Sequence, residues 1–174
     1  MTDNIIIAGF GGQGILFAGK ILAYAALLKG KQLSWLPSYG PEMRGGTANC
    51  HVIISDEPVG SPIIINPNIL ISMNKPSLEK FENDVVEGGT IIYDKSLIDR
   101  EVERKDVKVS AVEATGIATK EAKSNMANMI MLGALLKATN IFTLDEIRAG
   151  VSKAVPPTKQ EMVDYNMKLI ERGY

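Results

Sequence analysis

The sequence predicts an α/β fold with a Rossmann-like, mostly parallel sheet flanked by helices, and with further helices at the C-terminal end. Short apolar runs of strand length alternate with segments of helical periodicity through most of the chain. A glycine-rich turn, GFGGQG at residues 9–14, joins the first apolar run to the first helical segment. A chain of 174 residues suffices for a sizeable core, so residues 1–174 are predicted to form a single domain.

The N-terminal part predicts a strand, turn, helix and strand in that order. Residues 4–9 form a continuous apolar run typical of a buried parallel strand. Residues 13–29 place apolar side chains at helical spacing, and Gly30 can end that helix. A second strand is expected at residues 32–36.

A long loop and an alternating strand follow. Residues 37–46, PSYGPEMRGG, hold two prolines and three glycines, which predicts a loop. In residues 47–55 apolar and polar side chains alternate, which predicts a half-exposed or edge strand.

The rest of the chain predicts three short strands and several helices. The strands are expected at residues 69–73, 90–93 and 107–112. The helices are expected after Pro76, weakly at 117–124, and at 125–138, 145–154 and 159–172. In the apolar helix 125–138, Asn125 is the expected N-cap, Asn128 is expected to hydrogen-bond across an interface, and Gly133 allows another helix to approach closely.

Composition limits the classes of function. The net charge of −1 gives no general attraction to nucleic acid or to an anionic membrane, so neither is expected as a partner. No apolar stretch approaches the roughly 20 residues that span a bilayer. The first four residues lack the basic start of a signal peptide, which makes the cytoplasm the expected location.

The chain has one cysteine and one histidine, the adjacent Cys50 and His51. A single cysteine cannot hold an iron–sulfur cluster, which needs about four thiolates, and zinc sites with several such ligands are equally excluded. Adjacent strand residues point to opposite faces, so the two side chains are not expected to form a nucleophile–base pair. We expect Cys50 to be a small buried core residue.

The glycine turn admits three interpretations. Gly9, Gly11 and Gly14 match the pattern G-x-G-x-x-G, and a helix N-terminus offers free N–H groups to an anion. A nicotinamide dinucleotide site also needs an acid at the end of the second strand, yet the first acid there is Glu42, deep in the proline–glycine loop. The alternatives are another anion or a neighbouring subunit, or a tight turn without a ligand. Gln13 would offer an uncharged amide at the helix start.

The second loop carries polar side chains among glycines and prolines. Tyr39, Glu42 and Arg44 are not expected in the core. If the first two strands are parallel, this loop lies beside the glycine turn at the carboxyl edge of the sheet, where ligands bind in such folds. Arg44 can pair with a carboxylate or phosphate, or with Glu42 on a surface loop.

Four segments together resemble a known family. GFGGQGI, AGKILAYAALLKG, SYGPEMRGG with its following strand, and NMANMIMLGAL are similar in order and spacing to the gamma subunit of 2-oxoacid:ferredoxin oxidoreductases. The resemblance covers nearly the whole chain. YGPEM is most similar to the 2-oxoglutarate and branched-chain 2-oxoacid members, and the same domain occurs within single-chain pyruvate:ferredoxin oxidoreductases.

The resemblance implies a complex that oxidatively decarboxylates a 2-oxoacid with coenzyme A, giving acyl-CoA, CO₂ and reduced ferredoxin. Thiamine diphosphate, magnesium and iron–sulfur clusters would lie on partner alpha, beta and ferredoxin-like delta subunits. This chain would be an accessory subunit that is inactive alone, binds no cofactor by itself and contacts coenzyme A in the complex. In isolation it can form a homo-oligomer.

The resemblance places both glycine-rich motifs on a surface that faces the partner subunits near the entrance for coenzyme A or substrate. The matching residues are Gly11, Gly12, Gln13, Gly14, Tyr39, Glu42, Arg44, Gly45 and Gly46. No catalytic residue and no metal ligand is expected on this chain. Two other functions stay open on the sequence: a free-standing nucleotide-binding reductase and an interaction module without a ligand.

Overall fold

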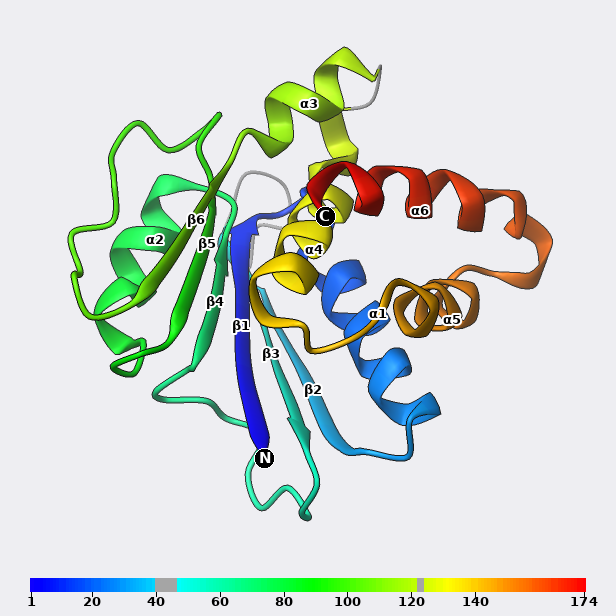
Figure 1. Cartoon of the computed structure of the whole chain (residues 1–174), viewed down its shortest axis with the longest axis horizontal. Coiled ribbons are helices and arrows are strands. Elements are labelled where there is room, and N and C mark those ends of the chain that lie inside the picture. Colours follow the sequence, from blue (N-terminus) through cyan, green and yellow to red (C-terminus); the bar gives the residue numbers. More distant parts are fainter. Residues whose placement is uncertain (40–46, 122–123) are drawn as a thin grey trace.

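A computed structural model describes residues 1–39, 47–121 and 124–174, apart from the side chains of Tyr39 and Ser124. Within these residues, six strands form one mixed sheet with helices on both faces (Figure 1). The strands are β1 (Thr2–Phe10), β2 (Gln32–Tyr39), β3 (Thr47–Ser55), β4 (Ile69–Ser72), β5 (Thr90–Asp94) and β6 (Lys108–Val112). The α-helices are α1 (Ile15–Leu28), α2 (Lys75–Phe81), α3 (Ala114–Lys120), α4 (Ala127–Thr139), α5 (Leu144–Ala154) and α6 (Glu161–Gly173). The predicted α/β class with helices at the C-terminal end is confirmed.

The sheet joins a parallel half to an antiparallel half, in the order β2-β3-β1-β4-β5-β6. Strands β1, β4, β5 and β6 are parallel, whereas β3 is antiparallel to both β1 and β2. Of the two alternatives expected for residues 47–55, the edge strand is wrong because β3 lies inside the sheet, whereas the half-exposed strand is confirmed. Its alternation arises because Cys50 and Val52 are buried beneath α1, while Asn49 and His51 on the other face are only half-buried.

Strand β2 forms one edge of the sheet and continues beyond its predicted end. It includes Pro37, which is paired with Cys50 of β3, and ends at Tyr39. Proline lacks an N–H group and is tolerated on an edge strand, where one side of the backbone needs no partner. The loop predicted at residues 37–46 is therefore wrong for its first three residues, which belong to β2.

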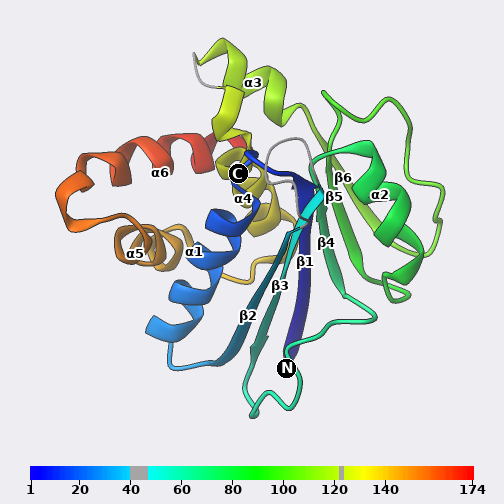
Figure 2. The same ribbon diagram turned by 180° about the vertical axis from the view of Figure 1, so that it is seen from behind.

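The helices cover the two faces of the sheet unequally. Helices α1, α4, α5 and α6 build the larger core with one face, on which Ile7 and Val52 are buried. Helix α2 covers the other face through Leu78 and Phe81. Figure 2 shows from behind that α2 lies across the sheet from α1, α5 and α6. Among the described residues, none of the helices has both the length and the apolar character needed to cross a bilayer.

Helices α4 and α6 cross at a pair of glycines. A Cβ atom at Gly133 would collide with the carbonyl oxygen of Ile170, and a Cβ at Gly173 would collide with that of Ile130. Each helix therefore approaches the backbone of the other, which confirms the expectation for Gly133.

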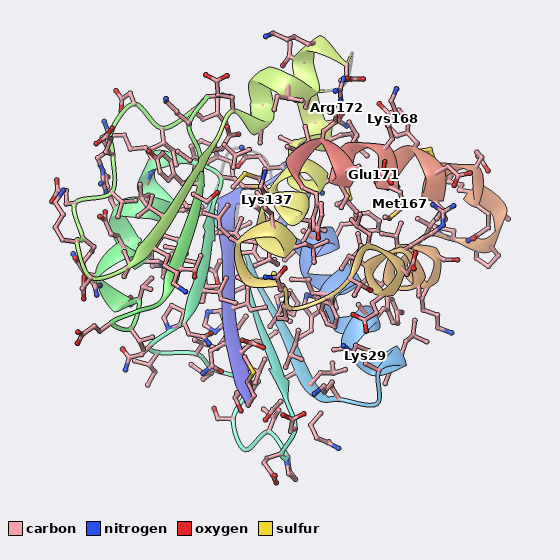
Figure 3. All side chains as sticks on the ribbon, in the orientation of Figure 1. Lys29, Lys137, Met167, Lys168, Glu171 and Arg172 are labelled. Atoms are coloured by element: carbon pink, nitrogen blue, oxygen red, sulfur yellow. The ribbon has the colours of Figure 1, made fainter. Side chains whose placement is uncertain are left out.

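The outer side of α6 is polar and is tethered to the end of α3. Met167 is buried in the core, while Lys168 and Glu171 of the next turn are exposed (Figure 3). Lys168 and Arg172 both form ion pairs with Glu121, which directly follows α3. These ion pairs link the outer side of α6 to the end of α3.

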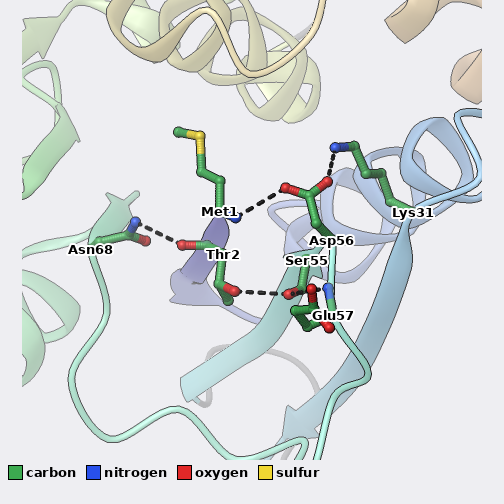
Figure 4. Close-up of polar contacts among 7 residues, drawn as sticks. All are labelled: Met1, Thr2, Lys31, Ser55, Asp56, Glu57 and Asn68. Carbon is green, nitrogen blue, oxygen red and sulfur yellow. Dashed lines mark hydrogen bonds and ion pairs between the residues drawn. The ribbon is translucent and has the colours of Figure 1, made fainter.

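Polar contacts close the opposite, amino-terminal edge of the sheet (Figure 4). The carboxylate of Asp56 pairs with Lys31 and, at 3.0 Å, with the amino group of Met1. Hydrogen bonds from Lys31 and from that amino group lower the pKa of Asp56 to about 2. The hydroxyls of Thr2 and Ser55 share a hydrogen bond of 2.8 Å. These contacts fasten the start of β1 to the end of β3, far from the glycine turn.

Candidate functional site

The strand ends that flank both glycine-rich segments meet at the carboxyl edge of the sheet. Strands β1 and β2 run in the same direction because both are antiparallel to β3 between them. Phe10 pairs with Thr47, and Tyr39 pairs with Ala48, so these ends lie side by side. Glu42, Arg44, Gly45 and Gly46 of the predicted site lie outside the described residues, and Tyr39 is described only by its backbone.

The fold itself explains three glycines of the turn. Gly12 and Gly14 have φ angles of 93° and 73°, in the left-handed region that favours glycine. A Cβ atom at Gly9 would lie 2.8 Å from Cδ1 of Ile15, and one at Gly14 would collide with the side-chain amide of Asn128. Gly9, Gly12 and Gly14 are therefore accounted for without a dinucleotide.

Gln13 bridges the ends of two neighbouring parallel strands. Its Oε1 accepts a hydrogen bond of 2.6 Å from the N–H of Phe10, at the end of β1. Its Nε2 donates to the carbonyl oxygen of Met73, after β4, at 3.1 Å. The amide is thus bonded to main-chain groups on both sides of the crevice and is not free at the helix start, where the sequence placed it.

The N-terminus of α1 lacks a side-chain cap. Gly14 is the N-cap residue, and the first bond of the helix runs from the N–H of Ala18 to the carbonyl of Gly14. The N–H groups of Ile15, Leu16 and Phe17 have no hydrogen-bond partner among residues 1–39, 47–121 and 124–174. Unpaired N–H groups at the positive end of a helix dipole can bind an anion.

A cavity of about 240 Å³ opens beside the glycine turn. Its lining residues follow the parallel strands or lie at the start of α4 and in the turn before it, and they are Gly12, Gln13, Met73, Leu97, Thr115, Asn125 and Ala127. From β1 the chain continues towards β2, whereas from β4 it continues towards β5 and β6, so the cavity lies at the topological switch point. Ligands of open α/β sheets bind at this place.

All the lining residues of this cavity are uncharged. Behind it, the fully buried carboxylate of Asp94 accepts the hydroxyl hydrogen of Thr115 at 2.5 Å and the N–H of Ser96 at 3.0 Å. The carboxylate of Asp94 is therefore bonded to Thr115 and Ser96 and does not line the cavity. The uncharged lining suits a neutral part of a ligand or a neutral partner side chain.

Three further cavities, of about 170, 370 and 230 Å³, lie at the amino-terminal edge of the described structure. The first two are lined by Met1, Asp3 and Thr139, and the third by Thr2 and Ser55. We favour the cavity at the carboxyl edge, because loops after parallel strands gather there and the glycine turn lines it.

The sequence pointed to Gly12 and Gln13 but missed the other lining residues. Thr115 and Leu97 follow directly after strands that end at this edge. The rule that ligands bind after parallel strands gives a signal for both. Asn125, in the 3₁₀ turn before α4, and Ala127, at the start of α4, reach the cavity only through tertiary packing, which no local pattern predicts.

Asn128 forms a contact that the sequence placed elsewhere. Its Nδ2 donates to the carbonyl oxygen of Gly14 at 3.1 Å, within the same chain. The expected N-cap role of Asn125 is wrong, because a 3₁₀ turn at Ser124–Met126 precedes α4 and Met126 occupies the N-cap position.

Cys50 and His51 lie on opposite faces of β3, as predicted. The Cys50 thiol is fully buried and lies 3.6 Å from the carbonyl oxygen of Ile15, and burial raises its pKa to about 12. The Nδ1 atom of His51 accepts a hydrogen bond of 2.9 Å from the N–H of Ile64. The two side chains do not form a catalytic pair.

Family and sequence comparisons give one consistent result. A family model described as Pyruvate ferredoxin/flavodoxin oxidoreductase matches residues 4–174. Ketoisovalerate oxidoreductase subunit VorA of Methanothermobacter thermautotrophicus is 42% identical over 173 residues, covering 98% of this chain and 35% of VorA. 2-oxoglutarate synthase subunit KorC of Methanocaldococcus jannaschii is 37% identical over 177 residues, covering 100% of this chain and 93% of KorC. The chain thus spans about a third of VorA and nearly all of KorC.

Solved structures share the fold over nearly their whole length. The gamma subunit of a keto/oxoacid ferredoxin oxidoreductase from Geobacter sulfurreducens has a TM-score of 0.82 at 30% identity, covering 98% of this chain and 95% of that one. Pyruvate oxidoreductase subunit PORC from Thermotoga maritima has a TM-score of 0.77 at 29% identity, covering 99% and 95%.

Proposed function

The chain belongs to the pyruvate ferredoxin/flavodoxin oxidoreductase family, and we propose that residues 1–174 form a single gamma-type domain of a 2-oxoacid:ferredoxin oxidoreductase complex. The complex would convert a 2-oxoacid and coenzyme A into acyl-CoA, CO₂ and reduced ferredoxin. The observation that carries the proposal is the near-complete mutual coverage with KorC. Similarity to KorC and VorA favours 2-oxoglutarate or a branched-chain 2-oxoacid as substrate.

In this proposal the chain is an accessory cytoplasmic subunit that is inactive alone. Thiamine diphosphate, magnesium and iron–sulfur clusters on the alpha, beta and delta subunits carry the chemistry, and protein groups position and shield it. One cysteine cannot supply the thiolates of a cluster. Across the described part of the chain, no group of three or more histidines, cysteines, aspartates or glutamates is placed to hold a metal ion.

The carboxyl edge is the proposed contact surface for coenzyme A and for the partner subunits. The open N–H groups at the start of α1 fit a phosphate oxygen, and the neutral cavity beside them fits an uncharged portion of the same ligand. Gly11, Gly12, Gln13 and Gly14 would form one half of this surface. Tyr39, Glu42, Arg44, Gly45 and Gly46 would form the other half, with the Arg44 guanidinium on a phosphate.

The test is an Arg44→Ala substitution in the assembled complex. We expect the apparent KM for coenzyme A to rise about tenfold with kcat little changed, because a charge-assisted contact to phosphate would be lost. Arg148→Ala is the matched control, since Arg148 pairs with Asp164 on the distant α5–α6 side. Normal assembly with an unchanged KM would refute the coenzyme A contact. A chain that never co-purifies with thiamine diphosphate subunits would refute the subunit assignment.

The free-standing reductase is the competing function. A nicotinamide dinucleotide would need main-chain access at the crevice between β1 and β4, which the Gln13 side chain bridges. Titration of the isolated chain with NADH and NADPH separates the two functions. Binding with micromolar affinity would favour the reductase.

A further inference from the structure

Asn128 links the first turn of α4 to the N-terminus of α1. Its Nδ2 donates to the carbonyl oxygen of Gly14, the N-cap residue of α1, across 114 positions of sequence. Asn128 is only 4% exposed. Its side chain lies directly against Gly14, because a Cβ atom at Gly14 would collide with the amide. The position of α1 relative to α4 therefore depends on this contact.

An amide at position 128 is not explained by stability alone. Its Oδ1 has no hydrogen-bond partner among the described residues, although the atom is buried. Burying an unpaired carbonyl oxygen destabilises a fold, and leucine, which also branches at Cγ, carries no such unpaired oxygen. The contact with the glycine turn is the feature that distinguishes asparagine from leucine here.

The same turn of α4 belongs to the wall of the cavity. Asn125 and Ala127, which precede Asn128, line it together with Gly12 and Gln13. A shift of α4 against α1 would therefore change the cavity and the helix N-terminus at once. We infer that Asn128 is a positioning residue, which holds the glycine turn in register with the wall that α4 contributes. This inference rests on the proposed contact with coenzyme A.

The test uses an Asn128→Leu substitution in the assembled complex. Leucine keeps the branching at Cγ, replaces the amide by two larger methyl groups and removes the bond to Gly14. We expect the apparent KM for coenzyme A to rise about fivefold to tenfold while kcat stays within about twofold, since one positioning hydrogen bond is lost. Should Asn128→Leu fail to assemble, Asn128→Ala removes the same bond without adding volume, and it separates loss of the bond from overpacking by leucine.

Asn166→Leu is the matched control. Asn166 on α6 is 2% exposed, donates from Nδ2 to the carbonyl of Met162 at 2.7 Å, and likewise has an Oδ1 without a partner among the described residues. It does not contact the glycine turn, so its substitution should leave the KM unchanged. Equal KM values for Asn128→Leu, Asn128→Ala and wild type would overturn the inference. If Arg44→Ala still raised the KM in that case, the proposed function would stand; if it did not, the coenzyme A contact would fall as well.

Discussion

Two amide side chains, Gln13 and Asn128, bond the main-chain groups in and beside the glycine turn. Gln13 bonds the N–H of Phe10 and the carbonyl of Met73, and so occupies the crevice between the ends of β1 and β4. Asn128 bonds the carbonyl of Gly14 from the opposite side. Among the described residues, the N–H groups that begin α1 are left open, which favours a compact anionic group there.

His51 gives a prediction for the pH dependence of stability. Its neutral Nδ1 accepts the N–H of Ile64, and protonation would remove that acceptor. Burial, with a smaller contribution from the positive Lys80, lowers the pKa of His51 from 6.5. The unfolded chain therefore takes up this proton first as the pH falls. The contribution of His51 to the free energy of unfolding is constant above about pH 6.5. It is lost progressively as the pH falls from there through the folded-state pKa.

The measurement is urea unfolding of wild type and His51→Gln between about pH 8 and pH 5, because the difference between them isolates this group from the carboxylates. Glutamine keeps an acceptor for Ile64 and does not titrate. We expect the wild-type free energy of unfolding to fall more steeply below pH 6.5. Parallel curves for the two proteins would contradict the role given to the neutral imidazole.

At the scale of the elements, strand and helix positions were predictable wherever one local pattern sufficed. The apolar runs located β1, β4 and β5, and Gly30 ended α1 with a φ of 70°. The position of each strand within the sheet was not predictable. The alternation in residues 47–55 arises because one face of β3 is only half-buried, which also occurs for a strand inside a sheet. The prolines and glycines of residues 37–46 predict a loop, whereas Pro37 is tolerated in β2 because β2 is an edge strand, a position that local composition does not reveal.

The crossing of α4 and α6 gives a prediction about Gly133. Alanine is favoured over glycine within a helix by up to about 1 kcal/mol. Overpacking a tight contact costs about 1–3 kcal/mol or more, and here the obstacle is the backbone carbonyl of Ile170, which can move only with α6. We expect Gly133→Ala to lower the free energy of unfolding, measured in urea. Gly60→Ala is the control, because a Cβ there meets no atom within 4 Å. Equal free energies of unfolding for the two variants would show that α6 can shift to accommodate the added methyl group without loss of stability.

At the scale of the whole molecule, the two ends of the sheet differ in character. The amino-terminal edge is closed by paired charges around Asp56, whereas the carboxyl edge combines the open start of α1 with a neutral cavity. The sequence predicted that the two glycine-rich segments would share an edge, because this follows from parallel strands. It did not predict the bridge from Gln13 to Met73 or the bond from Asn128 to Gly14, because each joins residues at least 60 positions apart through packing.

This asymmetry predicts which end docks on the partner subunits. Leu97 lines the neutral cavity and is 45% exposed, so an aspartate there would place a charge on the proposed contact surface without disturbing the core. We expect Leu97→Asp to reduce co-purification with the partner subunits severalfold, because an uncompensated charge at an interface core is strongly unfavourable. Ile65→Asp is the control, since Ile65 is 76% exposed in the β3–β4 connection, which leaves from the opposite edge. The melting temperatures of both isolated variants should match wild type. Loss of assembly for Ile65→Asp and not for Leu97→Asp would place the partner at the other end of the sheet.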